Sequence, residues 1–476
     1  MNPADLTLAE QVAALAAGRV SSRELVEASL DRVARWQPHV NAYVAVHADA
    51  ARAAADAADR ARTHGRAMGP LHGVPLAHKD MFQRPGRPAG MGSRVPMPPD
   101  GVPSTVLARL DAAGAFELGA LNMAEFALGP TGHNAHTGVC RNAWNTAHVS
   151  CGSSSGGGVA VATRTVAASI GSDTGGSVRL PAAASGVVGL KPTYGRVTRA
   201  GMMPLSPSVD VPGLFARTAR DIALLLGVVA GHDARDPASS RRPVPDFAGG
   251  LGAGLRGLRI GVPSHHYMDG LAPGVERALE AALGTLAREG ATITRVNVPD
   301  PVPLTELSRV LVYAEAWAIH RAWMRAHAAG YTPQVRVRAA TGLGIPDDAY
   351  AEAQRLRPAL LRRFVSAVFD GCDAMFLPTL AIEVPTIEET DVGGGAALWA
   401  RLAALVPCTA PFNYLGLPAI TVPCGFGATG LPVGFQLAGR PFDEALLLRV
   451  SHAYQRVTDW HQRSPALPSA AIAASS

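Results

Sequence analysis

Apolar and polar positions near the N-terminus repeat with the period of an α-helix. Two capping boxes, at residues 7–10 and 21–24, each stand in front of a run of apolar residues at helical spacing. The residues of the two faces are Leu8, Val12 and Leu15, then Val26, Leu30 and Val33. The pattern predicts two helices within residues 1–65.

The pattern changes at about residue 66. Up to residue 225 the chain has short apolar runs interrupted by glycine and proline, which is typical of strands and loops that carry a site. Residues 231–257 are rich in Pro, Ser, Gly and Arg and predict a surface loop or linker.

The second half of the chain predicts an α/β arrangement. Residues 258–262 and 292–298 are expected to be strands around a helix at 274–289, which makes a strand–helix–strand unit. Residues 305–370 have a helical pattern, and strand-like runs such as 419–423 and 433–437 follow.

No break separates two self-sufficient cores, so we expect one α/β domain over residues 1–476. Its expected parts are N-terminal helices (1–65), a core that carries the site (66–225), a loop (226–257), a strand–helix–strand unit with a helical pocket region (258–372), the C-terminal part of the sheet (373–455) and a tail (456–476).

Composition narrows the class of protein. With 476 residues, 48% of them apolar, the chain can bury a large core. The net charge of +5 comes from dispersed basic residues rather than a basic stripe, so we expect no nucleic-acid surface. No apolar run is long enough to span a bilayer, and the first residues lack the features of a secretory signal. Five cysteines without CxxC pairing favour reduced thiols. We therefore expect a cytoplasmic protein without a membrane partner.

Lysine is rare among the basic residues of this chain. Of the 43 lysines and arginines, only Lys79 and Lys191 are lysines. An ammonium group can lose its proton in a buried site and a guanidinium cannot, so chemistry is one reason to retain a lysine. A GC-rich genome with two chance lysines is the alternative.

Residues 150–181 hold the candidate chemistry, because two Gly/Ser clusters flank an Ala/Val-rich stretch there. In the second cluster, consecutive backbone N–H groups up to Ser177 form a candidate oxyanion hole. A nucleophilic serine needs a base, and no histidine lies nearby in sequence. Lys79, in an apolar strand-like run where burial would lower its pKa, is the alternative base, and Ser153 is a candidate to carry the proton between them.

This segment resembles the glycine- and serine-rich pattern of the amidase signature family. Ser153 matches the family's bridging serine, which follows a cis peptide, and Ser177, 24 residues later, matches its nucleophile. Cys151 stands where the family usually has glycine, so the local backbone is expected to differ there. Similar stretches surround Lys79, Asn122, Asp210 and the C-terminal strands, so the resemblance covers nearly the whole chain.

The resemblance implies a central mixed, twisted β-sheet flanked by helices and a Ser–cis-Ser–Lys mechanism of acyl transfer without a metal or other cofactor. The implied catalytic residues are Lys79, Ser153 and Ser177, the oxyanion-hole residues are Thr174, Gly175, Gly176 and Ser177, and the supporting residues are Asp173, Arg179 and Ser154. Asp173 and Arg179 are expected to form an ion pair. Asp80 adjoins Lys79 and would favour its charged form, so the scheme requires Asp80 to point elsewhere.

The resemblance also implies where the substrate pocket lies. By resemblance, the loop with Gly129, Thr131 and His133 and the helical segment around 305–350 border it. Aromatic residues of that segment, namely Trp317, Trp323 and Tyr331, are compatible with an aromatic substrate, although aromatic residues on helices more often belong to the core.

Each of these residues could instead have a purely structural role. Ser177 could be a helix N-cap and Ser153 a turn residue, whereas Lys191, Asp210 and Asn122 are expected to be structural. The GxSxG pattern at residues 152–156 also matches a hydrolase nucleophile elbow, but no acid and histidine are marked downstream.

Three functions remain open at this point. The first is an amidohydrolase that cleaves the C–N bond of a small amide, anilide or carbamate, with a urethanase as a variant, a small molecule as its partner and a homodimer as a compatible assembly. The second is the catalytic, glutaminase-type subunit of a tRNA-dependent amidotransferase. The third is an inactive binding module on the same fold.

Overall fold

The computed structural model describes residues 2–66, 69–96, 101–393 and 395–468. Across these residues eleven strands form one mixed sheet in the order β1-β3-β2-β4-β6-β5-β10-β11-β9-β7-β8. The strands are β1 (Tyr43–Val46), β2 (Pro75–Lys79), β3 (Phe116–Leu121), β4 (Ala168–Asp173), β5 (Val188–Lys191), β6 (Val211–Ala216), β7 (Arg259–Pro263), β8 (Thr292–Val296), β9 (Ala374–Pro378), β10 (Ala419–Phe426) and β11 (Pro432–Ala438).

The sheet contains two parallel groups of strands separated by a run of antiparallel strands. Strand β2 runs parallel to both β3 and β4, and β7 runs parallel to both β8 and β9. The strands between these two groups pair antiparallel, as does the edge strand β1. The predicted class, a single α/β domain with a mixed sheet flanked by helices, is therefore confirmed.

Fifteen α-helices surround the sheet in the described ranges. They are α1 (Leu8–Ala16), α2 (Ser22–Val40), α3 (Ala48–Thr63), α4 (Thr105–Ala112), α5 (Ser155–Ala162), α6 (Arg179–Ser185), α7 (Ala219–Val229), α8 (Pro273–Arg288), α9 (Val302–His327), α10 (Pro333–Ala340), α11 (Asp347–Phe369), α12 (Ile387–Thr390), α13 (Ala396–Leu405), α14 (Ala410–Tyr414) and α15 (Glu444–Gln455). No helix in these ranges combines the length and apolar character needed to cross a bilayer.

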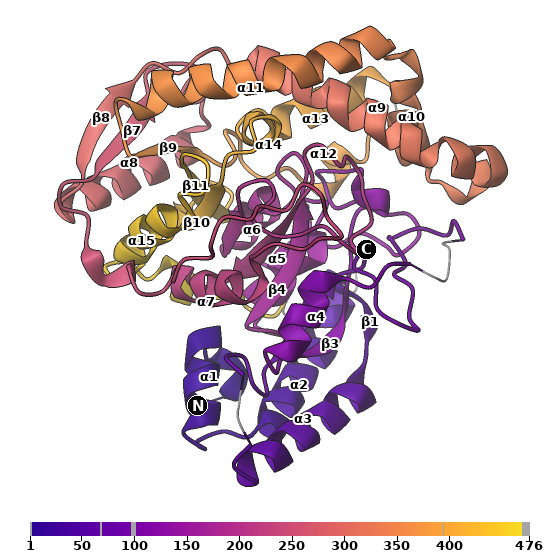
Figure 1. The fold of residues 1–476 in the computed structure, drawn as a ribbon, viewed down its shortest axis with the longest axis vertical. Coiled ribbons are helices and arrows are strands. Elements are labelled where there is room, and N and C mark those ends of the chain that lie inside the picture. The colour runs from indigo at the N-terminus through magenta and orange to yellow at the C-terminus, as the bar shows by residue number, and fades with distance from the viewer. Residues whose placement is uncertain (1, 67–68, 97–100, 394, 469–476) are drawn as a thin grey trace.

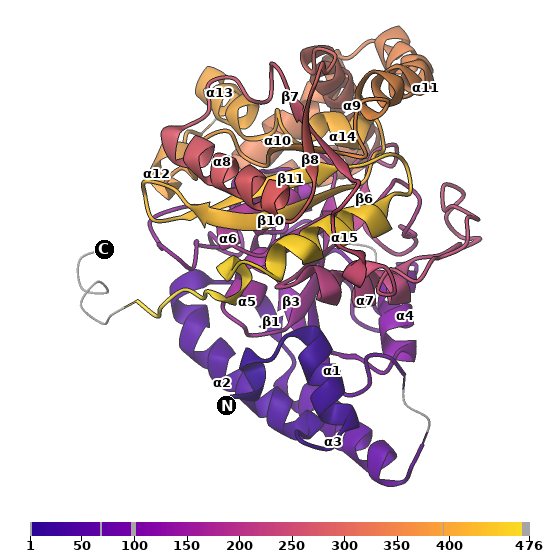
Figure 2. The ribbon, with the colours of Figure 1, turned by 90° about the vertical axis from the view of Figure 1, so that its left-hand side faces the viewer.

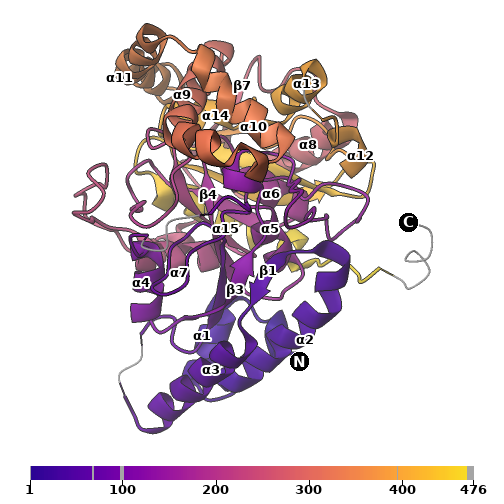
Figure 3. The same ribbon diagram turned by 90° about the vertical axis from the view of Figure 1, so that its right-hand side faces the viewer.

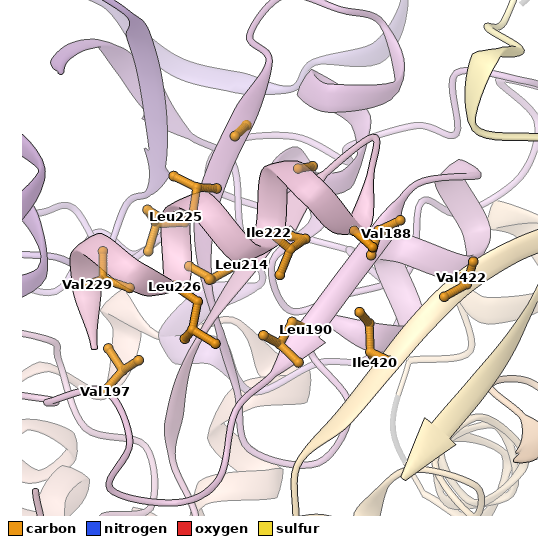
Figure 4. Close-up of a cluster of buried hydrophobic side chains, with 14 of the residues drawn as sticks. Val188, Leu190, Val197, Leu214, Ile222, Leu225, Leu226, Val229, Ile420 and Val422 are labelled. Carbon is orange, nitrogen blue, oxygen red and sulfur yellow. The ribbon is translucent and has the colours of Figure 1, made fainter. Parts of the chain in front are cut away.

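The helices divide between the two ends and the faces of the sheet. Helices α1, α2 and α3 lie at one end of the molecule, and α9, α10, α11 and α13 lie at the other (Figure 1). Seen from the side, α8 and α15 run along β10 and β11 (Figure 2). Helix α8 contacts both strands, and α15 contacts β10 and packs Tyr454 against Phe435 of β11. Helix α7 buries Ile222 and Leu226 against Leu190 and Leu214 of the neighbouring strands, in the largest apolar core cluster (Figure 4).

Most predicted elements are present within a few residues of their expected bounds. Both N-terminal capping boxes form, with Thr7 and Ser21 as N-cap residues. The strand–helix–strand unit is β7, α8 and β8, and the expected loop at 231–257 contains only one short 3-10 helix among its described residues.

Helix α3 corrects the sequence-based expectation of two N-terminal helices to three. Its sequence is rich in alanine, and among its described residues it buries only Ala51 and Ala55. Without large apolar residues its inner face gives no periodic signal, although alanine is the residue that most favours a helix.

Candidate active site

Lys79 ends β2, a strand with a parallel neighbour on each side, and its side chain is fully buried. Burial lowers the pKa of this amine to about 7, although the carboxylates of Asp210 and Asp173 act in the opposite direction. Near neutral pH a substantial fraction of the Lys79 side chain is therefore an uncharged amine.

Two hydroxyl groups contact this amine. Lys79 Nζ donates to Ser153 Oγ at 2.7 Å and to Ser172 Oγ at 2.9 Å. The Gly152–Ser153 peptide bond is cis, as the family resemblance implies. Ser172 was not predicted, although it lies near the end of β4, which runs parallel to β2, so its hydroxyl and the Lys79 amine lie at the same edge of the sheet.

Ser177 lies between β4 and α6 and lines a cavity, with 9% of its surface exposed. It is not the N-cap of α6, because Val178 holds that position and no side chain caps the helix. The loops of Ser153 and Ser177 are joined by a hydrogen bond from Ser154 N to Ser177 O at 3.2 Å. The structure thus places the Lys79 amine within hydrogen-bonding distance of Ser153. Among the described residues, no hydrogen bond joins the Ser153 and Ser177 hydroxyls.

The Ser177 loop is held by the carboxylate of Asp173. Burial alone would raise the pKa of this carboxyl, but the Arg179 guanidinium, at 2.9 Å, lowers it below its ordinary value. Both side chains are fully buried, so the predicted ion pair is confirmed. Asn413, which was not predicted, donates to Asp173 and accepts from Arg179.

Asp173 also removes one member of the predicted oxyanion hole. Gly176 N donates to Asp173 Oδ1 at 2.8 Å, so its N–H is not free to bind a substrate oxygen. The N–H groups that remain as candidates in the predicted set are those of Thr174, Gly175 and Ser177. Position 176 instead requires glycine, because its φ is +128° and a Cβ atom there would clash with Thr409 Oγ1 at 2.4 Å.

The other supporting residue, Ser154, is buried behind this loop. Its hydroxyl donates to the carbonyl of Ser172 at 3.1 Å and accepts from Ser172 N at 3.2 Å. Ser154 therefore holds the end of β4 against the segment with the cis peptide bond. Cys151, at the position where glycine was expected, adopts a positive φ of 58°, so the backbone keeps a left-handed conformation that costs a non-glycine residue energy.

Asp80 does not oppose the deprotonation of Lys79. Its carboxylate accepts from Gly90 N at 3.0 Å, and burial raises the pKa of Asp80 to about 6. It is not among the groups that shift the pKa of Lys79. The condition that Asp80 should point elsewhere is met.

Lys191 shows that burial alone does not mark a base. Burial lowers its pKa to about 7 as well. Its Nζ, however, donates to the carbonyl of Pro192, and within the described ranges it forms no hydrogen bond with a serine hydroxyl. Asn122 bonds backbone groups of the surrounding loops, and Asp210 accepts from the hydroxyl of Thr174 at 2.6 Å. These contacts agree with the structural roles expected for all three residues.

The cavity in front of Ser177 is lined by core loops and by residues of α9, α10 and α13. These three helices lie at the upper end of the molecule, above α5 and α6 (Figure 3). Its empty space, counted out to the open mouth, is about 750 Å³. The lining residues are Ala127, Gly129, Pro130, Thr174, Gly175, Ser177, Leu180, Leu205, Thr305, Ser308, Arg309, Val312, Tyr313, Arg338, Trp399, Leu402, Ala403, Val406 and Ala410. A mostly apolar lining with a few polar groups is typical of a small-molecule site.

The predicted pocket residues are only partly correct. Gly129 lines the cavity, whereas Thr131 and His133 are not in its lining, and His133 instead hydrogen-bonds Thr390 Oγ1 at 2.8 Å. Aromatic rings do line the cavity, but they belong to Tyr313 and Trp399. Of the three expected aromatic residues, none is in the lining, and Trp323 and Tyr331 pack around Phe126.

Arg338, on α10, was also missed. Its side chain lines the cavity and is only 9% exposed. Among the described residues its Nε has no hydrogen-bond partner, and its recorded hydrogen bond is a long one of 3.4 Å to the Tyr313 hydroxyl. No carboxylate of the described ranges forms an ion pair with it, and no Asp or Glu lines the cavity. A buried cation without a counter-ion is unfavourable, so this guanidinium is a ready site for an anionic group.

No group of three or more His, Cys, Asp or Glu side chains that could hold a metal ion occurs in the part of the chain that the structure describes.

Comparison with known proteins gives consistent matches over almost the full length. The family model described as Amidase matches residues 24–448. The chain is 41% identical to one of the subunits of the glutamyl-tRNA(Gln) amidotransferase of Chloroflexus aggregans, over 97% of this chain and 98% of that protein. Among solved structures, a chain of a vestigial protein complex connected with an s-triazine catabolic enzyme matches with a TM-score of 0.88 and 32% identity, over 95% of this chain and 98% of that one. The peptide amidase of Stenotrophomonas maltophilia matches with a TM-score of 0.83 and 32% identity, over 97% and 98%.

Proposed function

The chain belongs to the amidase signature family of amidohydrolases, which act on carbon–nitrogen bonds, and we propose that it does so through an acyl-enzyme on Ser177. In this proposal neutral Lys79 accepts a proton from Ser153 while Ser153 accepts one from Ser177, whose Oγ attacks the carbonyl carbon. When the tetrahedral intermediate collapses, the proton returns along the same path to the leaving nitrogen. Water then attacks the carbonyl carbon of the Ser177 ester and passes a proton to the relay. The relay returns that proton to Ser177 Oγ as the C–O bond breaks, and the acid is released.

The observation that carries this mechanism is the contact of a buried amine with Ser153. An amine with a pKa of about 7 can accept and return a proton near neutral pH, which is the requirement for a general acid–base group. The 2.7 Å contact gives that proton a direct path to Ser153. The proposal requires the Ser177 hydroxyl to turn toward Ser153 when the substrate binds, and geometry of this kind often tightens only in the complex.

The oxyanion is stabilised in this proposal by the N–H groups of Thr174, Gly175 and Ser177. Each such donor contributes about 3 kcal/mol when it points to the developing charge in a site that excludes water. Thr174 is held by its hydrogen bond to Asp210, and the Asp173 carboxylate holds the turn around Gly176.

For the substrate, we propose a small amide, anilide or carbamate that carries an acidic group. The guanidinium of Arg338 offers a bidentate site for a carboxylate, and Tyr313, Trp399 and Leu402 provide an apolar surface for the body of the molecule. The lining contains no Asp or Glu in the described ranges, so it provides no carboxylate for a substrate ammonium group.

A second candidate is the catalytic member of a tRNA-dependent amidotransferase. The sequence comparisons favour it over the first candidate, because proteins named as subunits of glutamyl-tRNA(Gln) amidotransferases match end to end at about 41% identity. On this candidate the chain would work in an assembly on glutamyl-tRNA, so the expectation of no nucleic-acid partner would be wrong. The charge of the cavity favours the first candidate, because free glutamine carries an ammonium group as well as a carboxylate.

The purified chain on its own separates the two candidates. The substrates are mono-4-nitroanilides of dicarboxylic acids of increasing length, their neutral methyl esters, and L-glutamine. We expect a free acid to be hydrolysed with a kcat/KM about 10- to 100-fold above its ester, as a charge-assisted hydrogen-bonded pair in a buried site allows. Arg338→Gln should abolish that preference. Arg309→Gln is the matched control, because Arg309 also lines the cavity but is exposed and paired with Glu306 at 3.2 Å.

Three outcomes decide between the candidates. Preference for an acid that depends on Arg338 supports the small acidic substrate. Hydrolysis of glutamine alone, or activity that appears only with companion subunits, supports the amidotransferase. A chain that hydrolyses none of these substrates under either condition contradicts both.

A further inference from the structure

Glu125 is a buried carboxylate with no part in the proposed chemistry and with an unusual number of donors. Only 1% of its surface is exposed. Ser93 Oγ donates to Oε1 at 2.7 Å, and His136 Nε2 lies 3.1 Å from the same atom. Thr332 donates to Oε2 twice, from its backbone N at 2.9 Å and from Oγ1 at 2.5 Å. A carboxylate bound in this way is strongly fixed in place.

The donors come from two different parts of the fold. Ser93 and His136 belong to core loops, whereas Thr332 is the N-cap residue of α10, the helix that carries Arg338. The side chain of Thr332 does not cap its own helix, since its hydroxyl is used by Glu125. Helices α9 and α10 and the residues between them (302–340) form a helical arm that lines the cavity. Glu125 thus connects this helical arm to the core loops beneath it.

The residues beside Glu125 reach the proposed reaction centre directly. Ala124 N donates to the carbonyl of Ser153 at 3.0 Å, and Ala127 lines the cavity. A displacement of Glu125 would therefore shift the backbone at Ser153 and the start of α10.

Phe126 fixes the same segment by packing. Its ring lies among three side chains of the helical arm, with centroid distances of 4.6 Å to His320, 5.2 Å to Tyr331 and 6.2 Å to Trp323. Phe126 and Ala127 adopt positive φ angles of 50° and 60°, a conformation that costs energy in residues other than glycine. The burial of Phe126 and the hydrogen bonds of Glu125 offset this cost.

We propose that Glu125 is a positioning residue for substrate selectivity: by holding the start of α10 to the segment that contacts Ser153, it sets where the Arg338 guanidinium lies relative to Ser177. This inference rests on the proposed function, in which Arg338 binds an acidic group of the substrate. Without the connection α10 stays packed but shifts, so the Arg338 guanidinium no longer reaches the carboxylate of a substrate whose scissile bond lies at Ser177, and that binding contribution is lost. A neutral substrate that does not use Arg338 is affected much less.

The test removes one donor at a time from the same carboxylate. Thr332→Val removes the hydroxyl on the side of the arm, and Ser93→Ala is the matched control that removes the hydroxyl on the side of the core. With the preferred dicarboxylic mono-4-nitroanilide, we expect Thr332→Val to raise KM about tenfold with kcat within about twofold, the signature of lost substrate binding. The corresponding methyl ester should change less than about twofold, and Thr332→Ser should restore the wild-type values because it restores the hydroxyl.

Further readouts keep the test decisive. Glu125→Ala should abolish the preference for the acid over the ester if it folds, and thermal unfolding of all variants shows whether they do. Equal losses for acid and ester in Thr332→Val, or the same loss of selectivity in Ser93→Ala, would overturn the inference while leaving the proposed function intact. Wild-type protein that shows no preference for the acid contradicts the proposed substrate, and with it the premise of the inference.

Discussion

Two serines contact Lys79 at nearly equal distances, yet the mechanism gives only one of them a role in proton transfer. Ser153 Oγ lies 2.7 Å from Nζ and Ser172 Oγ lies 2.9 Å away, and both side chains are almost completely buried. Ser153→Ala and Ser172→Ala therefore remove the same atom, from the same amine, in the same kind of surroundings. A comparison of the two variants isolates the relay from the effect of hydrogen bonding alone.

The expected magnitudes differ by orders of magnitude. Loss of general acid–base catalysis lowers rates by about 10²- to 10⁴-fold, which is about 2.7–5.5 kcal/mol of the activation barrier. Loss of one hydrogen bond to Lys79 costs about 0.5–1.5 kcal/mol, which shifts the pKa of the amine by about one unit or less. Ser172→Ala removes an acceptor for the charged form, so it moves the pKa of Lys79 downward, and above that pKa the rate should fall by less than about tenfold.

The assay is the kcat/KM of both variants on a neutral 4-nitroanilide, at a pH above the Lys79 pKa of about 7. Thermal unfolding provides the control for folding, since both variants should lose similar, small amounts of stability. Equal losses of activity in the two variants, or nearly full activity in Ser153→Ala, would refute the relay through Ser153.

Three further results are expected. Because the pKa of Lys79 lies near 7 and its neutral form is the active one, kcat/KM for a neutral amide should rise about tenfold per pH unit below 7 and become flat above it; a profile that is flat from pH 5 to 9 contradicts this assignment. Gly176→Ala should lower the free energy of unfolding by about 1–3 kcal/mol or more, because of its φ of +128° and the 2.4 Å contact with Thr409 Oγ1. Gly175→Ala is its control in denaturant unfolding and should change less than about 1 kcal/mol, because no atom lies within 4 Å of the added Cβ. Asp173→Asn should cost about 3–5 kcal/mol in the same measurement, because it leaves a buried guanidinium without its partner, and a loss below about 1 kcal/mol would show that the ion pair is not needed.

Local signals in the sequence were enough to predict most elements of the fold. Capping boxes placed the starts of α1 and α2 at Thr7 and Ser21, and alternating element types identified the β7–α8–β8 unit. Strand order could not be obtained in this way, because pairings such as β5 with β10 join residues more than two hundred positions apart. They depend on which faces pack together across the whole chain, which periodicity does not record.

The residues of the site also fall into two groups, those marked by the local sequence and those whose contacts depend on the folded chain. Lys79 and Ser177 stood out through the scarcity of lysine and the pattern of glycine and serine, which are properties of the sequence itself, whereas the choice of Ser153 over Ser154 rested on the family resemblance. Lys191 shares the scarcity and the burial, and only its contact with a carbonyl distinguishes it. The hydrogen bond of Gly176 to Asp173 depends on how one loop turns back on itself, and no local pattern predicts that turn.

The cavity was the hardest part to predict for a physical reason. Arg338 and Trp399 reach it from helices whose own sequences contain nothing that marks a binding site. Their role follows from the way α10 and α13 lie over the core, and that arrangement depends on contacts such as the one between Glu125 and Thr332.

The most direct test of the account is covalent labelling with phenylmethylsulfonyl fluoride followed by peptide mapping. The account predicts an adduct on Ser177 in the wild-type protein, and in Ser153→Ala and Lys79→Met a labelling rate lower by about 10²-fold or more, as expected when the group that activates the nucleophile is lost. An adduct on Ser153 or Ser154, or labelling of Ser177 that is equally fast in all three proteins, would contradict the claim that a buried amine activates this serine through Ser153.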